Sequence, residues 1–186
     1  MRIISGKFKG QSIKFLKNKK TRPLKDSVKE NIFNILEHSN IIKVKIKNSN
    51  ILDLYSGVGS FGIECISREA DKVIFVEHDP QALNLLRTNL KNLSFLKSVE
   101  VINDTIANFF ALKHKEKCHI FFFDPPFADK EYITYLKILK ISKNFFKNHI
   151  VIVHRDKRSD DILNDCLNVK LVKVYGRSKI IFATFN

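Results

Sequence analysis

Hydrophobic and polar positions change period repeatedly after residue 50. Short apolar runs of strand length lie at 51–54, 73–76, 99–102, 120–123, 150–153, 169–174 and 179–185. Stretches with helical spacing follow the first five runs, at 63–66, 83–93, 106–112, 132–139 and 163–167. Strands that alternate with helices predict an α/β fold whose parallel sheet is covered on both faces. The last two runs are joined at 175–177, close enough for antiparallel pairing, which predicts a mixed edge.

Aspartates mark three expected helix starts. Asp79 precedes Pro80 and should cap the helix over 83–93. Asp160-Asp161 indicates the start of the last helix, around Leu163 and Leu167. Asp26 should cap an earlier helix, whose apolar face is Val28, Ile32, Phe33, Ile35 and Leu36.

The first 47 residues stand apart from the alternating pattern. Apolar residues at 3–4 and 13–16 flank a glycine-containing turn at 5–10, which predicts a β-hairpin followed by a basic loop. Residues 41–50 form a basic, polar connector. We therefore expect a hairpin and helix extension over 1–47 and one α/β domain over 48–186.

The charge balance favours an anionic partner. The chain of 186 residues has 33 Lys and Arg against 19 Asp and Glu, a formal net charge of +14. Nucleic acid is the better candidate than membrane, because no apolar run is long enough to span a bilayer. Charge also interrupts the start too early for a signal peptide, so a cytoplasmic location is expected. We also expect a monomer.

Residues 1–25 carry nine Lys or Arg and no acid. Interleaving with Phe8 and Phe15 favours nucleic-acid contact over the alternative, a solvated terminus. The candidate contacts are Lys7, Lys9, Lys19, Lys20 and Arg22.

The three cysteines are far apart and lack partners at metal-ligand spacing. A disulfide framework or zinc site is therefore not expected, and Cys65, Cys118 and Cys166 should be reduced and mostly buried. No metal is expected at the functional site.

A glycine loop follows the run at 51–54. Gly57, Gly59 and Gly62 have the G-x-G-x-x-G spacing that lets a nucleotide-type cofactor approach the backbone at a helix N-terminus. Glu77 ends the next strand, twenty residues past Gly57, where a carboxylate binds ribose hydroxyls. Nicotinamide dinucleotides and S-adenosylmethionine both fit this place. Asp53 favours the second, because a carboxylate suits a methionine ammonium and repels a pyrophosphate.

Asp124-Pro125-Pro126-Phe127 ends the fourth run of the α/β pattern. Taken alone, this motif would indicate only that prolines end the strand. The glycine loop, Glu77, Asp104 and Asp124, however, all fall at strand ends, where ligands of such sheets bind. The Asp124 carboxylate and Pro125 carbonyl can accept hydrogen bonds from an exocyclic base amine, and Phe127 can stack on the base. This favours transfer of a methyl group to that amine.

The segments ILDLYSGVGSFGIE, VIFVEHD and FFFDPPF are similar to those of S-adenosylmethionine-dependent amino-methyltransferases. With RIISGKFKG and TRPLKDSVKENIFNIL, the chain resembles the RsmD family, which methylates the N2 amine of a guanine in 16S ribosomal RNA. The resemblance implies a Rossmann-like class I methyltransferase with a seven-stranded mixed sheet, its last strand antiparallel and helices on both faces. It also implies the partner, 16S RNA or the small ribosomal subunit.

Site residues follow from the resemblance. The methionine end would contact Asp53 and the loop from Gly57 to Gly59, the ribose would contact Glu77, and the adenine would contact Asp104, Thr105 or a backbone group. Further candidates for cofactor binding are Tyr55, Ser56 and His78. The target amine would contact Asp124, Pro125, Pro126 and Phe127.

Four positions depart from the family pattern. The pair Asp104-Thr105 stands where Gly-Asp is frequent, and Ser27 stands where a basic residue is common. Glu69 replaces a frequent Gly, and His154 a frequent acid. For His154, as for the other histidines, we expect a structural role.

Three other functions remain open on the sequence. A DNA amino-methyltransferase acting on adenine N6 or cytosine N4 shares the chemistry, but about 50 N-terminal residues leave little room for a sequence-reading module. A non-catalytic RNA-binding ribosome assembly factor would not need the cofactor. An oxidoreductase linked to a nicotinamide dinucleotide is disfavoured by Asp53 and the Asp-Pro-Pro-Phe motif.

Overall fold

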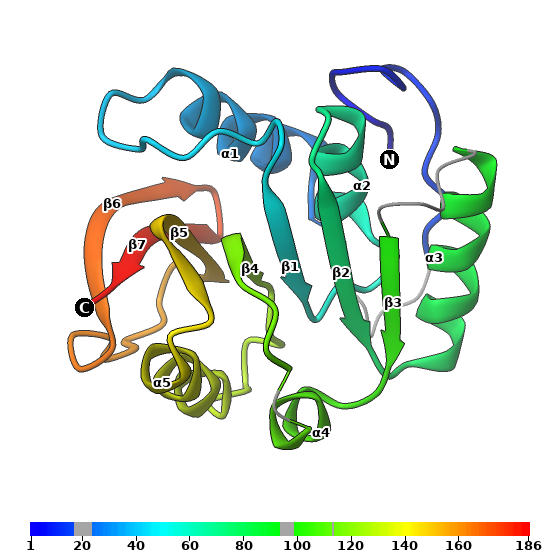
Figure 1. The fold of residues 1–186 in the computed structure, drawn as a ribbon. Helices are drawn as coiled ribbons and strands as arrows, with labels where there is room; N and C mark the ends of the chain where they lie inside the picture. Colours follow the sequence, from blue (N-terminus) through cyan, green and yellow to red (C-terminus); the bar gives the residue numbers. More distant parts are fainter. Residues whose placement is uncertain (17–23, 94–98, 113) are drawn as a thin grey trace.

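A single mixed sheet forms the centre of the molecule (Figure 1). The computed structural model describes residues 1–16, 24–93, 99–112 and 114–186. Within them the strand order is β3-β2-β1-β4-β5-β7-β6. The strands are β1 (Asn50–Leu54), β2 (Lys72–Glu77), β3 (Val99–Asn103), β4 (Cys118–Phe123), β5 (Phe145–Asp156), β6 (Leu167–Tyr175) and β7 (Ser178–Phe185). The helices are α1 (Asp26–His38), α2 (Ser60–Ser67), α3 (Pro80–Asn92), α4 (Ile106–Ala111) and α5 (Tyr132–Ser142).

Strand directions confirm the predicted mixed sheet. The strands β1 to β5 pair in parallel, and β7 runs antiparallel to both β5 and β6. Leu54 at the end of β1 pairs with Val76 of β2 and Phe123 of β4. The carboxyl ends of three central strands are therefore level, so the residues that follow them meet at one edge.

Both faces of the sheet are covered, as the alternation predicts. Ile51 packs in a cluster with side chains of α1, α2 and α3, whereas Leu52 and Leu54 pack in a second cluster with α4 and α5. Figure 1 shows the two groups of helices on different sides of the strands. No helix in the described ranges is long and apolar enough to cross a membrane.

Of the three predicted helix caps, one is confirmed. The Asp79 side chain accepts a hydrogen bond from the Ala82 N–H at 2.8 Å, and Pro80 is the first residue of α3. The Asp26 prediction is wrong by one residue, because Lys25 occupies the cap position and Asp26 already lies in the first turn of α1.

The predicted last helix is wrong. Residues 159–163 have no regular secondary structure, residues 164–166 form a turn, and Leu167 is the first residue of β6. Leu163 and Leu167 are both buried, but a turn brings them there. Asp161 does not start a helix, because its carboxylate binds the buried Arg155 at 2.9 Å. The ion pair with Arg155 stabilises the Asp161 carboxylate more than the N-terminus of a helix would.

The connector over 41–50 is less polar in the structure than expected. Ile42, Val44 and Ile46 are buried, whereas the intervening Lys43 and Lys45 are exposed. The alternation has the period of a strand, although residues 41–46 form no ladder. The apolar half of the segment extends the core beside α1.

The N-terminal segment pairs as a short hairpin, as predicted. Arg2 and Ser12 form an antiparallel bridge, and the Ile3 N–H donates to the Gln11 carbonyl at 2.9 Å. The basic loop predicted after it includes residues 17–23, which lie outside the described residues. The hairpin packs on α2 through its turn, where the Lys7 N–H donates to the Ser67 carbonyl at 2.8 Å.

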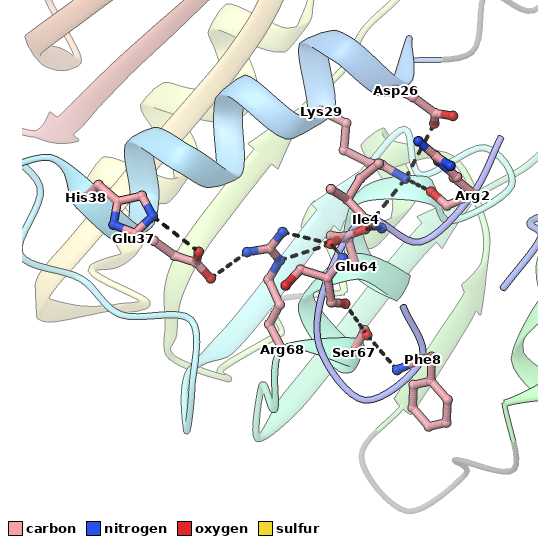
Figure 2. Close-up of polar contacts among 11 residues, drawn as sticks. Arg2, Ile4, Phe8, Asp26, Lys29, Glu37, His38, Glu64, Ser67 and Arg68 are labelled. Carbon is pink, nitrogen blue, oxygen red and sulfur yellow. Dashed lines mark hydrogen bonds and ion pairs between the residues drawn. The ribbon is translucent and has the colours of Figure 1, made fainter. Parts of the chain in front are cut away.

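A buried polar network fastens the hairpin to α1 and α2 (Figure 2). Glu64 of α2 is fully buried, and its carboxylate accepts from the Ile4 N–H at 2.7 Å and the Ser5 N–H at 2.9 Å. Lys29 of α1, also fully buried, donates to the Arg2 carbonyl at 2.7 Å and lies 3.7 Å from the Glu64 carboxylate. The hairpin therefore has a defined place on the sheet domain.

Glu69 follows α2 in the left-handed conformation, with φ of 66°. A side chain is strained there, and glycine adopts this conformation readily. The positive φ at this position explains why glycine is frequent there in the family pattern. Here the Glu69 carboxylate binds Lys7 and Lys47 at 2.9 and 2.8 Å, and those bonds, Lys47 first, lower its pKa to about 2.

Candidate functional site

A cavity of about 440 Å³ opens at the carboxyl ends of the central strands. Its wall brings together most of the residues predicted from the motifs, namely Asp53, Tyr55, Ser56, Gly57, Glu77, His78, Asp124, Pro125, Pro126 and Phe127. These residues come from three different strand ends, which the parallel register places side by side. The predicted coincidence of motifs at one sheet edge is therefore found in the structure.

The glycine loop is built from left-handed residues. Tyr55, Gly57 and Gly59 have φ of 59°, 55° and 84°. A Cβ at Gly59, the N-cap of α2, would be strained by the φ of 84° and would lie 2.4 Å from a methyl carbon of Leu86, so both the backbone and the packing favour glycine there. The strained Tyr55 backbone costs on the order of 1–3 kcal/mol, and such strain is concentrated at functional sites. At Gly57, which lines the cavity, the loop thus presents its backbone without a side chain.

Asp53 lies in β1 beneath this loop. It is 1% exposed, and its Oδ2 accepts a hydrogen bond from the Gly62 N–H at 2.9 Å. Burial raises the pKa of the Asp53 carboxyl well above its usual range, and the Gly62 bond offsets only part of this effect. A cation bound in the cavity would favour the ionised form.

Glu77 ties the second strand to the glycine loop. Its Oε2 accepts from the Gly57 N–H at 2.7 Å, and its Oε1 accepts from the N–H groups of His78 and Asp79 at 2.9 and 2.8 Å. A carboxylate has about four acceptor positions. One position on Oε2 therefore remains for a ligand hydroxyl.

The half-buried Asp124 side chain begins a chain of hydrogen bonds that runs into the core. Its Oδ1 lies 2.8 Å from Nδ1 of His154, and His154 Nε2 lies 2.9 Å from the Ser178 hydroxyl. His154 also lines the cavity, with its ring edge-on to Phe127 at 5.8 Å. The structure thus brings to the site a histidine for which the sequence predicted a structural role.

Arg155 holds the backbone of the same motif. Its guanidinium, fully buried, donates to the carbonyls of Pro126, Phe127 and Asp129, each at 3.0 Å. A guanidinium has five donors in a fixed fork, so it can fix several carbonyls at once. The sequence gives no signal for this role, because the carbonyls lie 26 to 29 residues away.

The N-terminal segment completes the cavity. Met1, Phe15, Leu16 and Leu24 supply an apolar wall. The buried Asn89 of α3 fixes this wall through two hydrogen bonds to the Lys14 backbone, at 2.9 and 3.0 Å. The same amide donates to the Val58 carbonyl in the glycine loop at 3.2 Å. The sequence predicted nucleic-acid contact for this segment and gave no indication of its apolar wall.

Other predicted residues lie away from the cavity wall. Asp104 and Thr105 immediately precede Ile106, which lines it, but their side chains cap α4 by bonds with Asn108. Their role stays a prediction. Gly59 starts α2 and is not among the described lining residues.

The predicted nucleic-acid contacts lie in the N-terminal segment. Lys7 pairs with Glu69, and Lys9 is exposed in the hairpin. Lys19, Lys20 and Arg22 lie outside the described residues. In the ranges that the structure describes, no cluster of three or more His, Cys, Asp or Glu side chains could hold a metal ion.

Comparison with known proteins identifies the family. The family model described as Conserved hypothetical protein 95 matches residues 1–184. The Ribosomal RNA small subunit methyltransferase D of Buchnera aphidicola subsp. Baizongia pistaciae is 35% identical over 190 residues, covering 100% of this chain and 91% of that protein. The protein of the same name from Haemophilus influenzae is 36% identical over 129 residues, covering 68% and 64% of the two chains.

The fold comparison agrees with the sequence comparison. The solved structure of yhhF from Escherichia coli matches with a TM-score of 0.83 and 22% identity, covering 100% of this chain and 98% of that one. The fold of this chain thus matches that of yhhF over nearly the whole length of both chains. The chain belongs to the RsmD family of S-adenosylmethionine-dependent methyltransferases.

Proposed function

We propose that the chain transfers a methyl group from S-adenosylmethionine to the exocyclic N2 amine of a guanine in 16S ribosomal RNA, free or within the small subunit. The observation that carries this proposal is the meeting of Asp124-Pro125-Pro126-Phe127 with Asp53 and Glu77 in one cavity. Two carboxylates suited to the cofactor thus share a wall with a motif suited to a base amine.

The residues present fit S-adenosylmethionine. The cavity of about 440 Å³ lies within the roughly 300–1,000 Å³ typical of small-molecule sites. The buried Asp53 would bind the methionine ammonium, which offsets the cost of ionising it there. Glu77 would use its free acceptor position for a ribose hydroxyl. Tyr55, Ser56 and Gly57 would line the methionine end, and His78 the ribose.

Asp124 would orient the target amine. Its Oδ1 is hydrogen-bonded to His154, whereas its Oδ2 accepts no hydrogen bond from the residues that the structure describes. Together with the Pro125 carbonyl, Oδ2 would accept from the two N–H groups and favour a pyramidal nitrogen. Phe127 would stack on the guanine. The cofactor supplies a methyl group activated on a sulfonium.

Positioning is the main contribution of these groups to the rate. A guanine amine is a weak nucleophile because its lone pair is delocalised into the ring. Holding nitrogen and methyl carbon in line can lower the barrier by roughly 7–11 kcal/mol. The apolar wall from the N-terminal segment would exclude water from the reacting groups.

The substrate class rests on charge and on the relatives. The net charge of +14 suits a polyanion, and both curated relatives described above are named for the small ribosomal subunit. Lys7, Lys9, Lys19, Lys20 and Arg22 remain our candidates for phosphate contacts.

The experiment is transfer of labelled methyl from S-adenosylmethionine to unmethylated small subunits, naked 16S RNA and DNA, followed by nucleoside digestion. Label in N2-methylguanosine from RNA or subunits, with none in DNA, is the expected result. Label in DNA, or label in another nucleoside, would refute the proposed substrate. Asp124→Ala should abolish transfer and leave cofactor affinity within a few-fold, and unimpaired turnover would refute the role of Asp124.

A further inference from the structure

His154 contacts both of the groups that would contact the target base. Its Nδ1 is 2.8 Å from Asp124 Oδ1, and its ring lies edge-on to Phe127. It is 4% exposed and comes from β5, the strand beside β4, which carries the motif. No other side chain in the described ranges hydrogen-bonds the Asp124 carboxylate.

The neighbours of His154 determine which nitrogen carries the proton. An ionised Asp124 can only accept a hydrogen bond, so Nδ1 must be the donor. Nε2 of the neutral ring then accepts from the Ser178 hydroxyl, 2.9 Å away. Ser178 lies at the start of β7, which pairs with β5, so the imidazole is held at both ends by the sheet.

We infer that His154 is a positioning residue for methyl transfer: by occupying Oδ1 it fixes the Asp124 carboxylate with Oδ2 directed to the substrate amine. This inference rests on the proposed function and deepens it. Without the imidazole, the carboxylate could rotate about its Cβ–Cγ bond and present neither oxygen in a fixed place. Since alignment supplies much of the rate, the loss should appear in kcat rather than in binding.

The chain contains a matched control in the same strand. His149 of β5 is also buried, at 7% exposure, and its Nδ1 lies 2.8 Å from the Phe146 carbonyl. Its Nε2 accepts from the Phe185 N–H at 2.9 Å. The two histidines thus have similar burial and two hydrogen bonds each, but His149 does not line the cavity.

The test compares steady-state kinetics of His154→Ala, His154→Asn and His149→Ala on small subunits or 16S RNA. In His154→Ala we expect kcat to fall on the order of 100-fold, with the KM for RNA and the Kd for cofactor within a few-fold. The asparagine amide can place a donor where Nδ1 lies, so His154→Asn should recover most of the lost kcat. His149→Ala should lower the unfolding midpoint and leave kcat near that of the wild type.

Three kinetic results would overturn the inference. In the first, His154→Ala retains wild-type kcat. In the second, His149→Ala loses as much kcat as His154→Ala, which would indicate a general packing defect. In the third, His154→Asn is as slow as His154→Ala, so that the bond at Nδ1 does not matter.

A spectroscopic measurement keeps the inference separate from the proposed function. If the wild type methylates no RNA, the proposed function fails, and the ring ¹⁵N signals of His154 in the full-length protein still decide whether Asp124 is held. We expect the Nδ1–H tautomer of the neutral ring, and a change in those signals in Asp124→Ala. An Nε2–H tautomer, or signals that Asp124→Ala leaves unchanged, would overturn the inference.

Discussion

Removing the Glu64 carboxylate should release the N-terminal hairpin from the sheet domain. Figure 2 shows Glu64 at the centre of the network that joins the hairpin, α1 and α2. The side chain is fully buried and accepts from two backbone N–H groups, those of Ile4 and Ser5. It also pairs with Arg68 at 2.9 Å and lies 3.7 Å from Lys29.

The cost of Glu64→Ala follows from what remains buried. Removing one partner of a buried ion pair typically costs about 3–5 kcal/mol, and each orphaned N–H adds about 1–3 kcal/mol. Burial already lowers the pKa of Lys29, and Glu64 is the main group that opposes this effect. Detachment of the hairpin would return these groups to water, and this limits how far the free energy of unfolding can fall. We therefore expect about 3–5 kcal/mol, partly as local detachment.

The assay combines urea unfolding with amide hydrogen exchange at Ile4 and Ser5. Glu69→Ala is the control, since Glu69 binds Lys7 and Lys47 near the same hairpin but its side chain is 38% exposed. We expect no resolved change in the unfolding midpoint for Glu69→Ala. A loss below about 1 kcal/mol in Glu64→Ala, with both N–H groups still protected, would refute the reasoning.

Two further predictions concern titratable groups. Burial raises the pKa of Asp161, but bonds from Lys130 and Arg155 outweigh it and lower the pKa below its usual value. The folded state therefore binds the proton more weakly, so the stability advantage of the wild type over Asp161→Asn should be complete above about pH 5 and disappear as the pH falls through the folded pKa. A constant difference across an acid titration of unfolding would contradict this. Burial raises the pKa of the Cys118 thiol to about 12, so a thiol reagent at neutral pH should label Cys118 only as fast as the protein opens, and rapid labelling in the native state would be the contrary result.

The motif-bearing part of the cavity was predictable because its motifs are local in sequence. The glycine loop, Glu77 and Asp124 lie at or directly after strand ends, and parallel strands bring their carboxyl ends to one edge. The periodic pattern located the strands to within a few residues, so the meeting of Glu77 and Asp124 followed from topology alone.

The residues that hold the cavity in shape were not predictable in this way. Asn89 and Arg155 bind backbone groups that are 26 or more residues away in sequence, and neither stands in a recognisable motif. Local periodicity also misled at Leu163 and Leu167, whose spacing suits a helix as well as a turn.

The sequence by itself determined the fold class, the glycine loop, the motif after β4 and the basic character, because each depends on neighbouring residues or on composition. The tertiary structure alone decided that the N-terminal segment forms a wall of the cavity and that His154 reaches Asp124. Such contacts depend on the register between strands and on the satisfaction of buried polar groups by distant partners. They are properties of the packed chain, and no local pattern encodes them.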